Sequence, residues 1–277
     1  MEALIASAGA GDLEPLENAI AELDDEGKRA AAARRDWEWS TALHFAADEG
    51  HTGVCAYLVQ RLGVHVNPRN LHGETPLYKA VENGHVGTAK WLLTNGADPH
   101  VKSSLGNTNL HNAAIRGDLK LVMILLENGV PVNSHSVMMG TPLACAVKSG
   151  SFACFNALVQ AGAAPETMEY PLHDAAKCGS IEIVNYFLEA GYDPNSCNKD
   201  GSKPILIAAS NNDLAVVQVL FPLTTQLSDF PNWTVNCIME YALRKNKEMV
   251  ADQAHIEEAD PWRSQFVKVR YNGMLYI

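Results

Sequence analysis

The chain has 277 residues, 47% of them hydrophobic, and a formal net charge of −11 at pH 7. This length allows a large core. The acidic balance excludes a general nucleic-acid binder, because phosphate contacts require clustered Lys and Arg. Apolar runs stay shorter than the roughly 18 residues that a membrane-spanning helix needs, so we expect no membrane span.

The N-terminal end and the cysteines both indicate an intracellular protein. Met1–Leu4 lacks a basic stretch followed by an apolar one, so no secretory signal is expected. The six cysteines show no CxxC spacing and no density typical of a disulfide framework. Reduced thiols and a cytoplasmic location are the expectation, with a nuclear location as the alternative.

Residues 1–35 are expected to form an N-terminal capping repeat and a link. An apolar stretch, Leu4–Ala8, is followed by Gly11 and by a second helix over 13–23. Terminal repeats depart from consensus because one of their faces meets water. The link, 24–35, is rich in Ala and Arg, and a solvated helix or loop is favoured there over a nuclear signal.

The stretch from Thr75 to Pro99 shows most clearly how residues 36–221 are organised. Thr75 is a suitable N-cap, and Pro76 is a suitable first helical residue because its missing N–H costs nothing there. Apolar residues at helical spacing follow, and Gly84 ends the first helix. A second, leucine-rich helix completes the unit.

The same unit recurs along the chain with a nearly constant period. Its first residue returns after 34, 33, 33, 29 and 33 residues, at these positions: Thr41, Thr75, Thr108, Thr141, Tyr170 and Lys203. One helix pair cannot bury its own apolar face, so such copies must stack. The pattern therefore predicts an array of about six repeats over 36–221.

This unit resembles the ankyrin repeat, whose signature is T-P-L-H-x-A-A-x-x-G-H followed by a leucine-rich helix and G-A-D-x-N. The resemblance implies an all-α solenoid of stacked helix pairs with short β-hairpin tips. We expect the tips near Leu71, Leu105, Met138 and Asp200. The copy at Tyr170 comes early, so the link before it, 166–169, should lack a full hairpin.

Five segments also resemble the plant ankyrin–tetratricopeptide proteins: Ala6–Asp12, Thr41–Ala47, Val54–Val59, Leu220–Thr224 and Trp233–Val235. In that family a tetratricopeptide array follows the ankyrin repeats, which implies chaperone-linked scaffolding. This chain ends before such an array, so a chaperone-binding clamp is not carried over. Residues 222–252 are expected to form a connector and a C-terminal capping helix that begins at Thr234, and 253–277 a loose tail.

Several positions depart from the repeat consensus. Trp39 and Met139 occupy the positions where a hairpin glycine usually stands, and Asn109 replaces the proline of the first helix.

Candidate chemistry is weak throughout the sequence. His44, His111 and His173 recur at the histidine of T-P-L-H, and recurrence at the repeat period predicts a packing role, such as tying neighbouring hairpins. Cys145 and Cys154 have no further Cys or His pair at the spacing of a zinc site. No Walker, GxSxG or HExxH motif occurs. We expect no enzyme activity, no catalytic residue, no metal and no cofactor.

The candidate partner-binding residues lie at the tips and at exposed positions of the first helices, which form the concave face of such solenoids. They are Trp37, Glu38, Asp48, Glu49, Leu71, His72, Glu82, Ser104, Leu105, Ile115, Arg116, Val137, Met138, Lys148, Lys177, Lys199 and Asp200. Acidic groups lead at the N-terminal end, and Lys and Arg appear from the third repeat onward. Apolar groups recur at the tips, where they either form a binding ridge or pack on the adjacent tip.

These observations predict a monomeric protein–protein interaction adaptor or scaffold. The alternative is a targeting or regulatory part of a larger, chaperone-linked or enzymatic protein whose other domain is missing here. The partner cannot be named from the sequence.

Overall fold

The computed structural model describes residues 2–228, 230 and 232–245. It divides into two compact units, Met1–Pro171 and Leu172–Ile277. The end of the expected capping helix, 246–252, and the expected tail, 253–277, lie outside the described residues.

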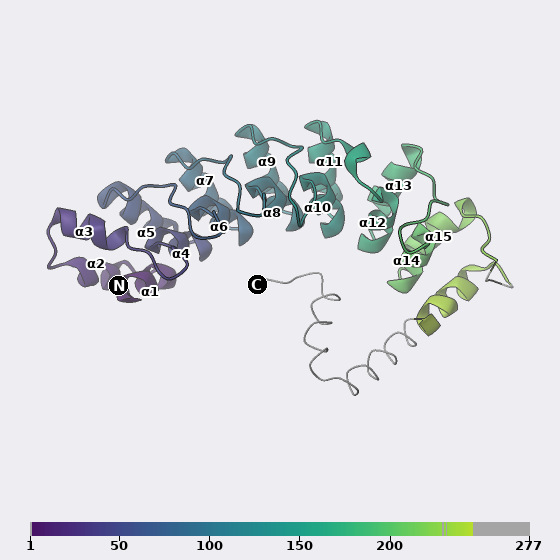
Figure 1. Ribbon diagram of the computed structural model, residues 1–277, viewed down its shortest axis with the longest axis horizontal. Helices are drawn as coiled ribbons and strands as arrows, with labels where there is room; N and C mark the ends of the chain where they lie inside the picture. The colour runs from purple at the N-terminus through teal and green to yellow at the C-terminus, as the bar shows by residue number, and fades with distance from the viewer. Residues whose placement is uncertain (1, 229, 231, 246–277) are drawn as a thin grey trace. The chain divides into compact units, whose positions relative to one another are not determined.

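The first unit is built from helix pairs that follow one another along the chain (Figure 1). Its elements are α1 Glu2–Ala10, α2 Leu13–Ile20, α3 Asp25–Ala32, α4 Ala42–Asp48, α5 Thr52–Ala56, the π-helix η1 Tyr57–Arg61, α6 Pro76–Glu82, α7 Val86–Thr94, α8 Asn109–Ile115, α9 Leu119–Glu127, α10 Pro142–Ser149, α11 Phe152–Gln160 and the 3₁₀ helix η2 Pro165–Thr167. The link that follows the N-terminal repeat thus contains a helix, α3.

The N-cap that the sequence predicts at Thr75 is present, and Ser151 caps another helix in the same way. The Thr75 hydroxyl accepts a hydrogen bond from the Tyr78 N–H at 3.2 Å, and Ser151 caps α11 by accepting from the Cys154 N–H at 3.3 Å. Each cap satisfies one of the backbone donors left free at a helix N-terminus. Between α6 and α7, Gly84 adopts a φ of 81°, which reverses the chain.

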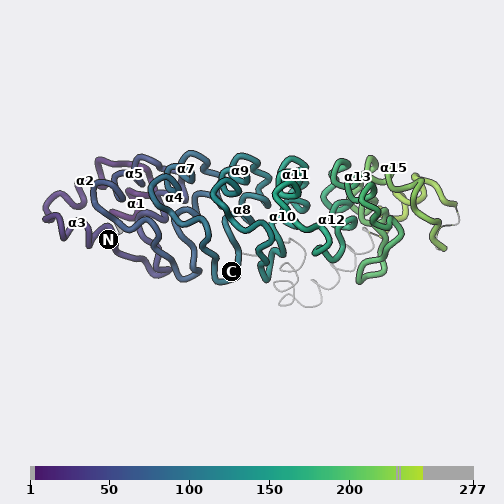
Figure 2. The backbone as a smooth tube through the Cα atoms, turned by 90° about the horizontal axis from the view of Figure 1, so that it is seen from above, coloured from purple at the N-terminus to yellow at the C-terminus, as the bar shows by residue number. Residues whose placement is uncertain are grey.

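Two layers of helices enclose the core of the first unit. The first helices of the repeats, α4, α6, α8 and α10, pack in succession, and the second helices, α5, α7, α9 and α11, do the same. Figure 1 shows the two rows, and Figure 2 shows the same succession from above. The leucines of the T-P-L-H motif lie inside, since Leu77 and Leu110 are 0% and Leu143 is 1% exposed.

The repeat of 34 residues accommodates its additional residue in the second helix. The spacing from His51 to Gly63 is one residue longer than the equivalent spacing from His85 to Gly96. At this place η1 interrupts the α-helix, and the Leu62 N–H donates to the Tyr57 carbonyl five residues earlier, at 3.1 Å. A π-turn is the usual way in which a helix absorbs one inserted residue.

The second unit contains α12 Pro171–Cys178 from Leu172 onward, α13 Ile181–Glu189, α14 Pro204–Ser210, α15 Leu214–Leu220 and the 3₁₀ helix η3 Phe221–Leu223. A further helix covers 235–245, within the segment for which the sequence predicts a capping helix. Aromatic rings hold this helix, because the Phe230 and Tyr241 centroids lie 4.6 Å apart and Trp233 stacks on Phe221 at 5.7 Å. Such ring pairs contribute beyond the area that they bury.

The expected hairpins occur as tight turns rather than as strands. Instead of paired β-strands, the described residues contain isolated antiparallel bridges, at Arg35–Thr41, Lys102–Thr108 and Ser136–Gly140. The turns are too short to extend the pairing. The link at 166–169 contains part of η2 and no hairpin, which confirms the prediction made from the repeat spacing.

Burial of Leu110 between repeats should make the stack sensitive to its truncation. We predict that Leu110→Ala lowers the free energy of unfolding by about 2–5 kcal/mol, the range for large-to-small changes in a core. Leu105→Ala is the matched control, because Leu105 is 51% exposed and should change stability by less than about 0.5 kcal/mol. Urea unfolding of both variants checks this, and equal midpoints would contradict the packing.

Candidate partner-binding surface

Four tips project from the first unit, at 36–40, 70–74, 103–107 and 136–140. In each tip the N–H of the first residue donates to the carbonyl of the fifth, at 2.9, 3.0, 2.9 and 2.8 Å respectively. These four five-residue turns are called tips one to four below.

Hydrogen bonds also join each tip to the next. They run from the Leu71 N–H to the Glu38 carbonyl (2.9 Å), from the Ser104 N–H to the His72 carbonyl (2.7 Å) and from the Val137 N–H to the Leu105 carbonyl (3.3 Å). The four tips thus form a continuous backbone ladder, which we call the tip ladder. Because the bonds use main-chain groups only, the side chains at the tips remain available.

The apolar side chains on the tip ladder face solvent. Trp37 is 82%, Leu71 57%, Leu105 51%, Val137 82% and Met138 69% exposed. We call these five residues the tip ridge. Their exposure does not agree with the alternative in which they are buried against the adjacent tip. Exposed apolar groups that recur on successive tips favour an interaction site.

Tip one contains a tryptophan in a conformation that favours glycine. Trp39 has a φ of 64°, which costs a side-chain-bearing residue about 1–2 kcal/mol. The Asp36 carboxylate stabilises the turn by accepting from the Glu38 N–H (2.8 Å) and the Ser40 N–H (2.7 Å). The Arg35 guanidinium lies 5.2 Å from the centre of the Trp39 ring.

Tip four also lacks the consensus glycine, but a different residue of this tip adopts the left-handed conformation. Met139 occupies the position equivalent to Trp39, but the left-handed conformation moves one residue on, to Gly140 with a φ of 80°. The loss of the consensus glycine is therefore harmless at tip four and strained at tip one.

The recurrent histidines connect neighbouring repeats, as the sequence predicts. The Thr41 N–H donates to Nδ1 of His44 at 3.0 Å, so the ring proton lies on Nε2, which donates to the Glu74 carbonyl at 3.2 Å. His111 donates to the Gly140 carbonyl in the same way, at 2.9 Å. In the second unit His173 contacts the Ser202 carbonyl at 2.9 Å. These contacts support packing rather than catalysis or metal binding.

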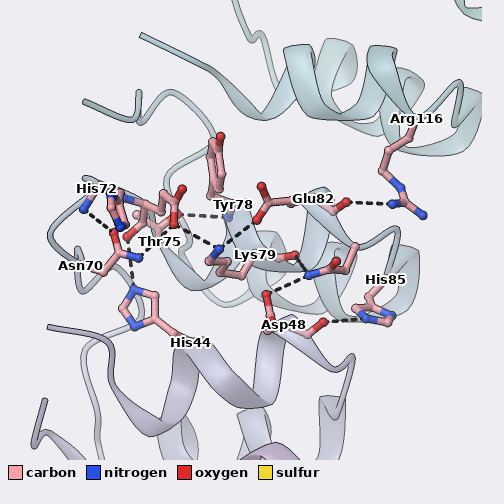
Figure 3. A network of polar contacts seen from close by, with 12 residues as sticks. His44, Asp48, Asn70, His72, Thr75, Tyr78, Lys79, Glu82, His85 and Arg116 are labelled. Atoms are coloured by element: carbon pink, nitrogen blue, oxygen red, sulfur yellow. Dashed lines mark hydrogen bonds and ion pairs between the residues drawn. The ribbon is translucent and has the colours of Figure 1, made fainter. Parts of the chain in front are cut away.

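Polar contacts cover the first-helix surface beside tip two (Figure 3). The Lys79 ammonium lies between the carboxylates of Glu74 at 3.1 Å and Glu82 at 2.9 Å. Asp48 accepts a hydrogen bond from the Asn83 amide at 2.8 Å, and burial raises the pKa of its carboxyl. Lys79 was missing from the sequence-based candidates, and its side chain is only partly exposed, at 25%. It partly neutralises the expected acidic end of the concave face.

Arg116 has a structural contact as well as an exposed side chain. Its Nη1 donates to the Glu82 carbonyl of the preceding repeat at 2.9 Å (Figure 3). His85 makes an equivalent bond to the Asp48 carbonyl at 2.8 Å. Truncating Arg116 would therefore disturb the stack, so this residue is a poor probe of binding alone.

The remaining candidates differ in exposure. Those exposed besides the tip ridge are Glu49, His72, Ser104, Arg116, Lys148, Lys177, Lys199 and Asp200. Those of intermediate exposure are Glu38, Asp48, Glu82 and Ile115. Lys177, Lys199 and Asp200 belong to the second unit, and the others belong to the first.

The described residues give little support for reaction chemistry. Burial raises the pKa of the Cys55 and Cys145 thiols to about 12, which keeps them protonated and unreactive. Within the described part of the chain, no group of three or more His, Cys, Asp or Glu side chains is placed to hold a metal ion. Among the described helices, none combines the length and apolar character required to cross a bilayer.

Comparison with known proteins agrees with this repeat architecture. The family model described as ankyrin repeats (3 copies) matches residues 3–103, 87–169 and 172–253. The chain belongs to the ankyrin-repeat family. The crystal structure of the human ASB11 ankyrin repeat domain resembles it with a TM-score of 0.67 and 26% identity, over 81% of this chain and 99% of that domain. This ankyrin fold is an interaction module and is not itself catalytic.

Curated relatives contain such repeats within longer proteins. The Caenorhabditis elegans transient receptor potential cation channel subfamily A member 1 homolog is 29% identical over 72% of this chain and 17% of its own length. Ankyrin repeat and SOCS box protein 5 of Mus musculus is 34% identical over 50% of this chain and 43% of its own length. E3 ubiquitin-protein ligase XBAT32 of Arabidopsis thaliana is 31% identical over 76% of this chain and 40% of its own length. The chain spans less than half the length of each.

The buried histidines should make the stability of this ankyrin array depend on pH. Burial lowers the pKa of His44 from 6.5 to about 4, and it lowers the pKa of His111 in the same direction. The unfolded chain therefore binds protons between pH 6.5 and 4 that the folded chain does not, and stability falls as pH decreases through this window.

We predict that the His44 contribution falls by about 2 kcal/mol between pH 7 and pH 5. Urea unfolding at both pH values checks this against His44→Gln, whose stability should be lower at pH 7 but less dependent on pH. An unchanged pH dependence in the variant would show that His44 titrates normally in the folded protein.

Proposed function

We propose that the chain is an adaptor or scaffold that binds a protein partner through the tip ridge and the adjoining first-helix surface. The exposure of Trp37, Leu71, Leu105, Val137 and Met138 on a backbone-bonded ladder carries this proposal. The ladder limits the ordering cost of binding, because the tips are already held in position. A large apolar side chain presented in this way is a suitable interface anchor.

Charge would select the partner more than it would strengthen the complex. Glu49 and Asp48 lie on the first repeat, whereas Arg116 and Lys148 follow on the third and fourth. A partner with the opposite order of charges would associate faster, and salt would slow this association. The proposal places the binding in the cytoplasm and in a monomer, as expected from the sequence.

A second candidate function is that this array is the partner-recognition part of a larger protein. The similarity to XBAT32, a ubiquitin ligase by name, covers 76% of this chain but only 40% of that protein. The same kind of array would then present a partner to a separate catalytic or chaperone-linked part, as also expected from the resemblance to the ankyrin–tetratricopeptide proteins. The surface used would be the same in both cases.

Single alanine variants of the tip ridge test the proposed binding. The full chain captures its partner from native tissue, the partner is identified by mass spectrometry, and affinity is then measured with both proteins purified. Leu71→Ala, Leu105→Ala and Met138→Ala should each weaken binding by about 1–4 kcal/mol if their side chains are anchors. Their thermal midpoints should stay close to that of the original chain.

Met123→Ala is the matched control for Met138→Ala, because Met123 is 44% exposed on α9, away from the tip ladder. It should leave affinity unchanged. If the tip variants melt early and bind normally once folded, the tip ridge is a packing feature and the proposal fails.

A further inference from the structure

Trp39 occupies a position where the backbone favours glycine. Its φ of 64° is equivalent to the φ of 73° at Gly73 and 81° at Gly106 in tips two and three. Backbone strain of this kind persists only where the surrounding structure fixes it, and strained residues are concentrated at functional sites. The Trp39 side chain is 55% exposed, so burial in the core does not explain it.

A hollow of about 650 Å³ lies beside the Trp39 ring, between the start of tip one and the segment that leads into tip two. Its apolar wall includes Trp39, Val64, Pro68 and Leu71. The volume is within the usual range of ligand and side-chain pockets. The hollow is therefore large enough for one or two side chains of an extended peptide.

Two arginines, Arg35 and Arg69, line the same hollow. Nη1 of Arg35 donates to the Arg69 carbonyl at 3.0 Å, and Arg69 donates to the carbonyls of Gly73 at 3.1 Å and Lys102 at 2.7 Å. Within the described part of the chain, neither arginine forms an ion pair with a carboxylate. Each guanidinium has five N–H donors, so both retain donors for a ligand.

The charge of this hollow is opposite to that of the chain. The protein carries a formal charge of −11, yet both of these cations are exposed and lack an acidic partner among the described residues. Arginine binds carboxylates in a bidentate manner, and an aromatic face beside it suits an apolar or aromatic neighbour. The pocket thus combines a site for a carboxylate with a site for an apolar side chain.

We propose that this hollow binds an extended segment of a partner protein in which a carboxylate stands next to an aromatic or aliphatic side chain. The carboxylate contacts Arg35 and Arg69, and the apolar side chain packs between Trp39 and Leu71. The hollow adjoins the tip ridge, because Leu71 belongs to both. Trp39, Arg35 and Arg69 lie outside the tip ridge, so changes at these three residues distinguish the hollow from the surface described under the proposed function.

A displayed library of random short peptides, selected on the full chain, tests the proposal. Recovered peptides should be enriched in Asp or Glu next to an aromatic or aliphatic residue. Trp39→Gly should weaken the affinity of a recovered peptide by about tenfold or more, as expected for a buried anchor. The same change should leave the thermal midpoint equal or higher, because it removes the strained side chain.

Two controls keep the site distinguishable. Met139→Gly changes the equivalent position of tip four and should leave peptide affinity unchanged, as should Leu105→Ala in the tip ridge. Arg35→Gln should weaken acidic peptides more than their amide counterparts. A selection that yields no such acidic peptides, or peptides that bind Trp39→Gly as well as the original chain, overturns the proposal whether or not the tip ridge binds a partner.

Discussion

Hydrogen bonds between successive repeats are the constraint on which the rest of the first unit depends. A single helix pair leaves its apolar face uncovered, so it is stable only when a neighbour is correctly aligned. The bonds of the tip ladder and the His44 and His111 contacts set this alignment at the hairpin side of the stack. Since they use backbone carbonyls as acceptors, they hold regardless of which side chains the tips carry.

Main-chain bonds align the repeats, while the tip side chains face solvent. A regular scaffold can therefore present a surface that varies from repeat to repeat. The threonine caps and buried leucines repeat from one unit to the next, whereas the exposed tip positions carry Trp37, Leu71, Leu105 and Val137. Changes at these positions leave the ladder intact. Partner selection can therefore differ between ankyrin proteins without a change of fold.

Regular features of the structure were predictable from the sequence, because each has a local cause. The period placed the helices, the T-P-L-H motif placed Leu110 in the core, and the early copy at Tyr170 indicated the missing hairpin. The π-helix at Tyr57–Arg61 was not predicted, although the single additional residue in that repeat was visible. Whether an insertion enters a loop or a helix depends on packing, which spacing alone does not reveal.

Nonlocal contacts were the part of the site that the sequence could not provide. Trp39 was recognised as a departure from consensus, but its left-handed backbone and its contact with Arg35 require the folded turn. The Lys79–Glu74 ion pair likewise depends on how tip two leads into α6, whereas Lys79–Glu82 is a local i,i+3 pair within that helix. The apolar tip residues named from the pattern are exposed, and the pattern missed Lys79. That these residues bind a partner stays a prediction.

Amide hydrogen exchange measured by NMR tests the tip ladder most directly. The N–H groups of Leu71, Ser104 and Val137 donate to the preceding tip, whereas the Trp37 N–H belongs to the first tip and makes no hydrogen bond within the described residues. The ladder predicts that the first three exchange at least about tenfold more slowly than Trp37, despite the exposure of the tip side chains. Exchange of all four at the rate of an unstructured peptide would contradict the account.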